Sequence, residues 1–103
     1  MIRRRRFADL VRRQLDLFEE EHAGLVRDCR AAERAYDRAE RDEAEEHYGD
    51  YLDLVDTGAD LLAQLRDSYA ARLDADSAEE YEAAFNRAVA KRLRPFAARS
   101  EEV

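Results

Sequence analysis

The sequence predicts an all-α protein built from a long antiparallel helical hairpin and a shorter third helix. Three observations lead to this fold class. Charged residues make up 42% and hydrophobic residues 46% of the 103 residues, a mix typical of long helices and coiled coils. Only 3 Gly and 1 Pro interrupt the chain. Apolar residues recur at the spacing of a helix face, and no useful length of chain alternates with the period of a strand.

The first helix is expected over about residues 4–41, because its apolar residues fall on one face. These residues are Phe7, Leu10, Val11, Phe18, Leu25, Cys29, Ala32, Tyr36 and Ala39. The end of this helix is its least defined boundary. A turn near Asp42 is favoured, since the acidic residues that follow would suit the positive end of a second helix. A turn near Gly49 and a single unbroken helix are the alternatives.

The second helix is expected over about residues 43–73, and its apolar stripe alternates steps of three and four. The stripe consists of Ala44, Tyr48, Tyr51, Val55, Gly58, Leu62, Leu65 and Tyr69. If the chain reverses before this helix, Gly24 and Gly58 lie at the same height. Each Gly costs a helix about 1 kcal/mol relative to Ala, so the pair suggests a close crossing of the two helices. Two unrelated, tolerated glycines are the alternative.

The third helix is expected over about residues 78–94. Ser77 and Glu80 have the spacing of a capping box at its start, and Pro95 ends it. The short connection from the second helix makes the two helices antiparallel neighbours. The remaining residues, 96–103, are expected to form a frayed tail. The whole chain, residues 1–103, is expected to form one domain.

The sequence also limits the cellular setting. A single cysteine, Cys29, excludes a disulfide within the chain and favours a reducing compartment. No apolar run approaches the roughly 20 residues that cross a membrane, and no apolar segment of a secretory signal follows the first arginines. We therefore expect a cytoplasmic protein that does not contact membranes.

The net charge of −7 is unevenly distributed along the chain. Residues 1–14 carry six arginines against one acid, residues 19–60 carry fifteen acids against five arginines, and residues 83–103 are again basic. In the hairpin the basic segments lie beside acids of the same chain. Arg92 and Arg94 are therefore expected to lie near the acids that begin at Glu19.

The N-terminal arginines are a candidate arm for nucleic acid, because clustered Arg side chains neutralise phosphates. They are Arg3, Arg4, Arg5 and Arg6. The acidic remainder of the surface would repel phosphate, so nucleic acid is not an expected partner. A solvated helix start that pairs with acids of its own fold is the favoured interpretation.

Two Glu–His pairs are candidate metal ligands. Glu19 and His22 have the Glu-x-x-His spacing of the ligand pairs in carboxylate-rich, ferritin-like bundles. Glu43 lies one turn before His47, so these two also share a helix face. With 25 acidic residues such pairs arise easily by chance. In the hairpin the two histidines also lie roughly 20 Å apart, too far for one metal cluster. We expect no metal and no cofactor.

No catalytic motif stands out. The sequence has no phosphate-binding glycine loop, no paired-cysteine motif and no serine-nucleophile elbow. Cys29 lies on the apolar stripe, where a small buried residue is the expected role. The chain is therefore not expected to be an enzyme.

The functional hypothesis rests on the expected lengths of the three helices. The two long helices would span roughly 55 and 46 Å and the third roughly 25 Å, so the third covers only half of the hairpin. The distal half, about residues 27–60, keeps an apolar stripe that a two-helix ribbon cannot bury alone. The stripe consists of Cys29, Ala32, Tyr36, Tyr48, Tyr51, Leu52 and Val55. We expect a homodimer in which two distal halves form a four-helix bundle, acting as a non-enzymatic interaction or assembly module. A metal-binding bundle and a nucleic-acid binder are the alternatives.

Overall fold

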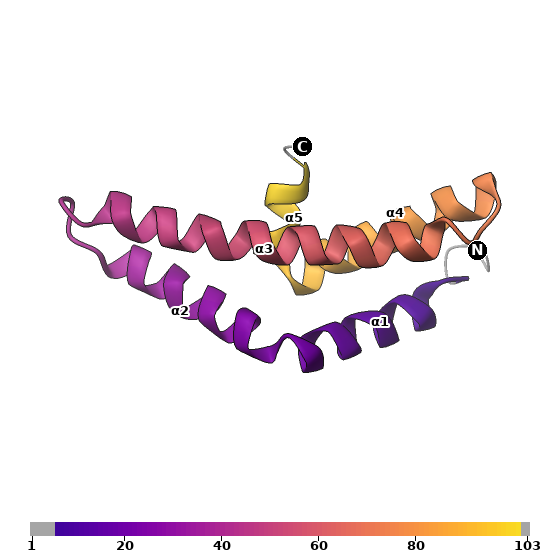
Figure 1. Cartoon of the computed structure of the whole chain (residues 1–103), viewed down its shortest axis with the longest axis horizontal. Coiled ribbons are helices and arrows are strands. Elements are labelled where there is room, and N and C mark those ends of the chain that lie inside the picture. Colours follow the sequence, from indigo (N-terminus) through magenta and orange to yellow (C-terminus); the bar gives the residue numbers. More distant parts are fainter. Residues whose placement is uncertain (1–5, 102–103) are drawn as a thin grey trace.

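The computed structural model describes residues 6–101, with side chains as far as Ala97. This part of the chain forms five helices and no strand, which confirms the all-α class for it. The helices are α1 (Ala8–Glu21), α2 (Ala23–Arg38), α3 (Ala44–Ala70), α4 (Ala75–Arg92) and α5 (Arg94–Glu101). They build an elongated molecule of 50 × 26 × 24 Å, in which α3 runs along most of the length (Figure 1).

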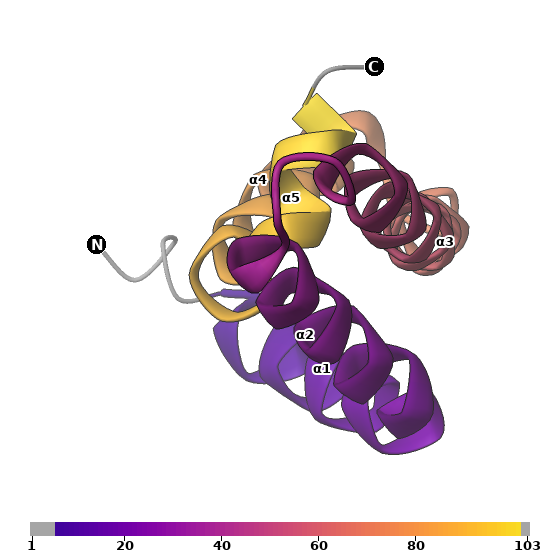
Figure 2. The ribbon, with the colours of Figure 1, turned by 90° about the vertical axis from the view of Figure 1, so that its left-hand side faces the viewer.

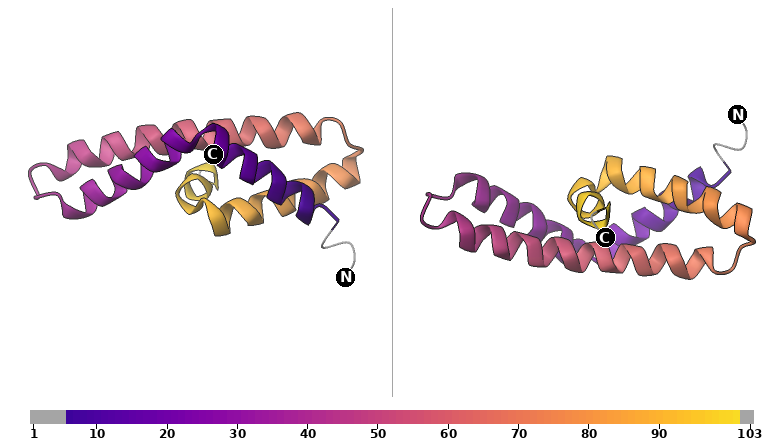
Figure 3. Two further views of the ribbon diagram at one scale, coloured as in Figure 1. Left: turned by 90° about the horizontal axis from the view of Figure 1, so that it is seen from below. Right: turned by 90° about the horizontal axis from the view of Figure 1, so that it is seen from above.

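The α2 and α3 helices form an antiparallel hairpin and pack side by side, as Figures 1 and 3 show. The chain reverses between Arg38 and Ala44, the region where the sequence favoured a turn near Asp42. Ala39 leaves the helical conformation with φ −69° and ψ 143°, which ends α2. Gly49 lies inside α3, so neither the alternative turn there nor one unbroken helix occurs.

The expected first helix over residues 4–41 is wrong, because the chain bends at His22. This residue takes φ −120° and ψ 34°, and it separates α1 from α2. Its N–H still donates to the Phe18 carbonyl at 2.9 Å, and its carbonyl accepts from the Val26 N–H at 3.1 Å. The bend therefore leaves no backbone group of His22 without a hydrogen bond. Beyond the bend, α1 packs on α4 rather than along α3.

Tyr81 of α4 lies at the centre of the core where α1, α3 and α4 meet. Its side chain is fully buried, and the rings of Phe7, Tyr69 and Phe85 lie 4.8–5.9 Å from its ring centre. Its hydroxyl donates to the Gln14 side-chain oxygen at 2.8 Å. A buried phenol of this kind needs a polar partner, and Gln14 supplies it from α1.

The α4 helix begins earlier than residues 78–94 would place it, and its cap is not Ser77. Asp74 is the N-cap, with an extended backbone, and its carboxylate accepts hydrogen bonds from the Ser77 N–H at 2.8 Å and the Ser77 hydroxyl at 3.2 Å. These two hydrogen bonds hold the pKa of Asp74 below its usual value. The expected capping box of Ser77 and Glu80 is wrong because Asp74 caps equally well and leads the helix by three residues.

The tail expected to fray over residues 96–103 is helical as far as the structure describes it. Leu93 ends α4 with φ −131° and ψ 53°, and α5 begins at the next residue. Pro95 lies in the first turn of α5, where its missing N–H has no helical acceptor in any case. Phe96 follows it and is 2% exposed. Pro95 therefore starts a helix as well as ending one.

The expected close approach of Gly24 to Gly58 is also wrong. A Cβ atom on Gly24 would make only an ordinary contact, 3.5 Å from the Arg27 guanidinium. A Cβ atom on Gly58 would overlap the ring of Phe96. Gly58 is thus the position where the α5 helix approaches the α3 backbone closely, and a side chain would not fit there.

Candidate interaction surface

The two halves of the hairpin differ in how many helices surround them. In the proximal half, α3 packs against α4 and α5, and α1 packs on α4 (Figures 1 and 2). In the distal half, the structure shows only α2 beside α3 (Figures 1 and 3). The α5 helix reaches α3 at Gly58, so the distal half spans about residues 27–57. The shortfall in coverage expected from the helix lengths is therefore present in the described part of the chain.

The stripe of expected interface residues divides into two groups. Cys29 and Val55 are 3% and 2% exposed, so they form the internal seam between α2 and α3 and are not presented to a partner. Placing these two at an interface is therefore a correction to the sequence-based expectation. The other five keep accessible surface: Ala32, Tyr51 and Leu52 are half-buried, and Tyr36 and Tyr48 are exposed.

Tyr36 and Tyr48 form a pair near the end of the hairpin. Their ring centres lie 5.2 Å apart at an angle of 46°, one ring from each helix. They are 38% and 45% exposed, and the only other large hydrophobic side chain exposed to this degree in the described part is Leu17 on α1. An exposed aromatic pair on a rigid two-helix scaffold is a typical anchor for another protein.

The side of α3 that faces α5 continues into the distal half without a covering helix. Leu54, Tyr51 and His47 lie four, seven and eleven residues before Gly58, so they extend the face that meets α5. All three are half-buried. On α2, two small half-buried residues lie one helical turn apart, Ala32 and Ala35. Small side chains on one helix and larger ones on the other leave a surface that another helix can approach closely.

The Tyr51 phenol lies toward α2. Burial raises its pKa to about 12, and the negative charges of Glu33 and Asp37 on α2 act in the same direction. Burial and the charge of Glu33 likewise raise the pKa of Cys29, which disfavours the thiolate. Both groups are neutral at physiological pH, which suits an apolar seam.

We expect the Tyr51 phenol to ionise well above the ordinary pKa of 10.0. Because its folded-state pKa is raised above the ordinary 10.0, its contribution to stability is complete below about pH 10 and is lost as the pH rises toward 12. Tyrosinate absorbance measures this titration. The Tyr51→Phe variant should lose a component near pH 12. An unchanged titration curve in that variant would contradict the placement of Tyr51.

The basic segments pair with acids of the same chain, as expected for Arg92. Its guanidinium donates to Glu19 at 2.7 Å and to Asp16, so α4 is tied to α1. These two carboxylates raise the pKa of Arg92. The expected pairing of Arg94 is not seen, because its side chain is exposed and has no acidic partner in the described part.

The candidate nucleic-acid arm is only partly described. Arg3, Arg4 and Arg5 lie outside the described residues. Arg6 lies 3.8 Å from the Glu80 carboxylate and 4.9 Å from the centre of the Phe7 ring. Both contacts place Arg6 against its own fold, at the start of α1.

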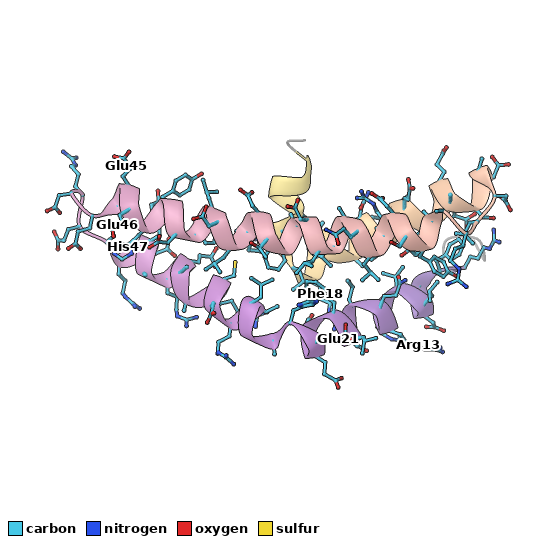
Figure 4. The ribbon with its side chains drawn as sticks, viewed as in Figure 1. Arg13, Phe18, Glu21, Glu45, Glu46 and His47 are labelled. Carbon is cyan, nitrogen blue, oxygen red and sulfur yellow. The ribbon has the colours of Figure 1, made fainter. Side chains whose placement is uncertain are left out.

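The four candidate metal ligands do not form a group. The Glu19 carboxylate accepts from Arg92, and the His22 ring packs on Phe18 with ring centres 4.8 Å apart. Figure 4 places His47 near the tip of the hairpin, and Glu21, the residue before His22, near the middle of the molecule. Glu43 is the residue just before α3. Among the side chains described, those of residues 6–97, no three His, Cys, Asp or Glu gather as metal ligands would.

The helices and the accessible surface define an all-α protein with a half-covered helical hairpin. None of the helices in the described part is both long and apolar enough to cross a membrane. No family model matches the chain, and no curated protein or solved structure shows a significant similarity to it.

Proposed function

We propose that this chain is a non-enzymatic interaction module that acts as a homodimer. In the dimer the distal halves of two hairpins pack together as a four-helix bundle. The observation that carries the proposal is the difference in coverage along α3, which has α4 and α5 beside it in one half and only α2 in the other.

A second copy suits this surface because each copy has the same half-buried residues without a covering helix. The half-buried residues of each distal half gain a cover when the same surface of another copy lies against them. A two-fold dimer satisfies both copies at once, and it is the commonest symmetry among soluble oligomers. The Tyr36 and Tyr48 rings, exposed in one copy, become buried anchors in the bundle.

The test is a double truncation of the aromatic pair. We expect Tyr36→Ala with Tyr48→Ala to raise the dimer dissociation constant about tenfold or more, the effect of losing a hot-spot pair. Both side chains are exposed in one copy, and Ala favours helix, so each chain should keep its fold. Sedimentation equilibrium measures the constant, and circular dichroism checks the helix content.

Leu17→Ala supplies the matched control. Leu17 is 53% exposed but lies on α1, far from the distal half, so its truncation should leave the dissociation constant unchanged. If the wild-type chain dimerises, and the double tyrosine variant and Leu17→Ala both have the same dissociation constant as wild type, the proposed surface is contradicted.

The two alternative functions lack comparable support. In the described part, one candidate residue of each alternative is already paired: Glu19 with Arg92, and Arg6 with Glu80. The interaction module is therefore the function we propose.

A further inference from the structure

Opposite charges lie at two places along the molecule, the tip of the hairpin and the corner between α4 and α5. The tip carries exposed acids in the turn and in the first residues of α3, among which Figure 4 shows Glu45 and Glu46 at the end of the hairpin. The tip acids are Glu40, Asp42, Glu43, Glu45 and Glu46. At the corner, Lys91 lies in the last turn of α4, and Arg94 is the first residue of α5.

The basic charge of the corner exceeds what the nearby described acids pair with. Arg92 is engaged by Asp16 and Glu19, which uses the nearest acids of α1. Lys91 and Arg94 are exposed, and no acid of the described residues pairs with them. The corner is therefore a basic site inside an acidic protein, and it is suited to an acidic partner surface.

The length of the distal half sets what the tip can reach in a dimer. Ala44, the first residue of α3, precedes Gly58 by fourteen residues, which is about 21 Å of helix. If two distal halves overlap fully with their long axes antiparallel, the tip of each copy arrives at the level of Gly58 in the other. Gly58 contacts Phe96 at the start of α5, so the arriving tip meets the α4–α5 corner.

The opposite arrangement is electrostatically unfavourable. In a parallel dimer the two tips would lie together, and the acids of both turns would face one another. Like charges placed together cost binding energy and discriminate against that orientation. The antiparallel arrangement replaces this repulsion with attraction at two symmetric contacts.

We infer that the two copies dock antiparallel, with the acidic tip of each seated against the basic α4–α5 corner of the other. The inference rests on the proposed homodimer and adds its orientation. It also assigns the second copy as the occupant of the corner.

A charge exchange tests the orientation. The tip variant is Glu45→Lys with Glu46→Lys, and the corner variant is Lys91→Glu with Arg94→Glu. In the antiparallel dimer each variant alone faces like charge at both contacts. We expect each to raise the dissociation constant about tenfold at low salt, with the loss shrinking at high salt. An equal mixture of the two should form a heterodimer about as tight as wild type, since both contacts again pair opposite charges.

The matched control places two lysines near the start of α4, the helix that follows α3. Asp76→Lys with Glu79→Lys makes the same charge change at the start of α4, beyond the reach of the tip. Its dissociation constant should equal that of wild type. If it instead weakens the dimer as much as the tip variant does, the effect is one of net charge, and the tip-to-corner contact is overturned.

The outcomes distinguish a failure of the antiparallel orientation from a failure of the homodimer. If the wild-type chain dimerises but the corner variant has the same dissociation constant, the antiparallel contact is overturned while the homodimer stands. The same holds if the mixture of the two variants does not recover the wild-type dissociation constant. A wild-type chain that stays monomeric overturns the homodimer itself. Weakening by both variants and recovery in the mixture supports both.

Discussion

Tyr81→Ala should lower the free energy of unfolding by about 3–5 kcal/mol, the cost of removing a large buried ring from a packed core. Tyr81 is fully buried, and three other rings surround it. Its hydroxyl also joins α4 to α1 through Gln14. Small domains have only about 5–15 kcal/mol of stability in total, so the variant should be largely unfolded at modest denaturant concentration.

Urea unfolding followed by circular dichroism measures this loss, at one protein concentration because dimerisation adds to stability. Tyr81→Phe is the matched variant, since it keeps the ring and removes only the hydroxyl that Gln14 accepts from. Its expected cost is about 1 kcal/mol, the net contribution of one hydrogen bond. If both variants cost the same small amount, the ring is not the centre of the core.

Gly58→Ala is expected to destabilise the protein by about 1–3 kcal/mol, although Ala is the better helix former. The added methyl group would overlap the Phe96 ring, and that ring is 2% exposed, so it has little room to move. The clash should push α5 away from α3. Thermal or urea unfolding measures the loss.

Gly49→Ala provides the control in the same helix. A Cβ atom there meets nothing within 4 Å, so this variant should gain up to about 1 kcal/mol from helix propensity alone. Adding Phe96→Ala to Gly58→Ala should remove the clash, so that Gly58→Ala becomes favourable in that background. A favourable effect of Gly58→Ala with Phe96 present would show that α5 does not lie against α3 as described.

Apolar spacing was sufficient to predict the hairpin, because it reports the phase of a helix face. The stripes placed Cys29 and Val55 on facing sides of two helices, and both are buried there. The same reasoning missed Leu15 and Val26, which are buried on α1 and α2. Leu15 lies four residues after Val11, and Val26 lies three residues before Cys29, so the same spacing could have found both.

The bend at His22 left no such signal. Phe18 and Leu25 are seven residues apart, so the stripe stays in phase across the bend as it would in a straight helix. Beyond the bend α1 packs on α4, a tertiary contact that the apolar spacing along one chain segment does not report. The start of α5 was missed for a different reason. Pro95 is both a helix stop and a good first-turn residue, and only the burial of Phe96 shows that the second role applies.

For the candidate interaction surface, apolar spacing predicted the region but not how far each side chain is buried. Tyr36 and Cys29 lie seven residues apart on one face of α2, yet Cys29 is buried and Tyr36 is 38% exposed. Their difference depends on position along the hairpin, because Cys29 lies nearer the helices of the proximal half and Tyr36 nearer the open tip. Spacing reports direction around a helix and carries no information about what lies beyond it.

The most direct test of whether a second copy covers the distal half is the molar mass in solution, measured by light scattering across a dilution series. We expect about twice the 12.0 kDa of one chain at micromolar concentration, falling toward the mass of a single chain on dilution. A mass of one chain at every concentration up to the highest attainable would contradict it.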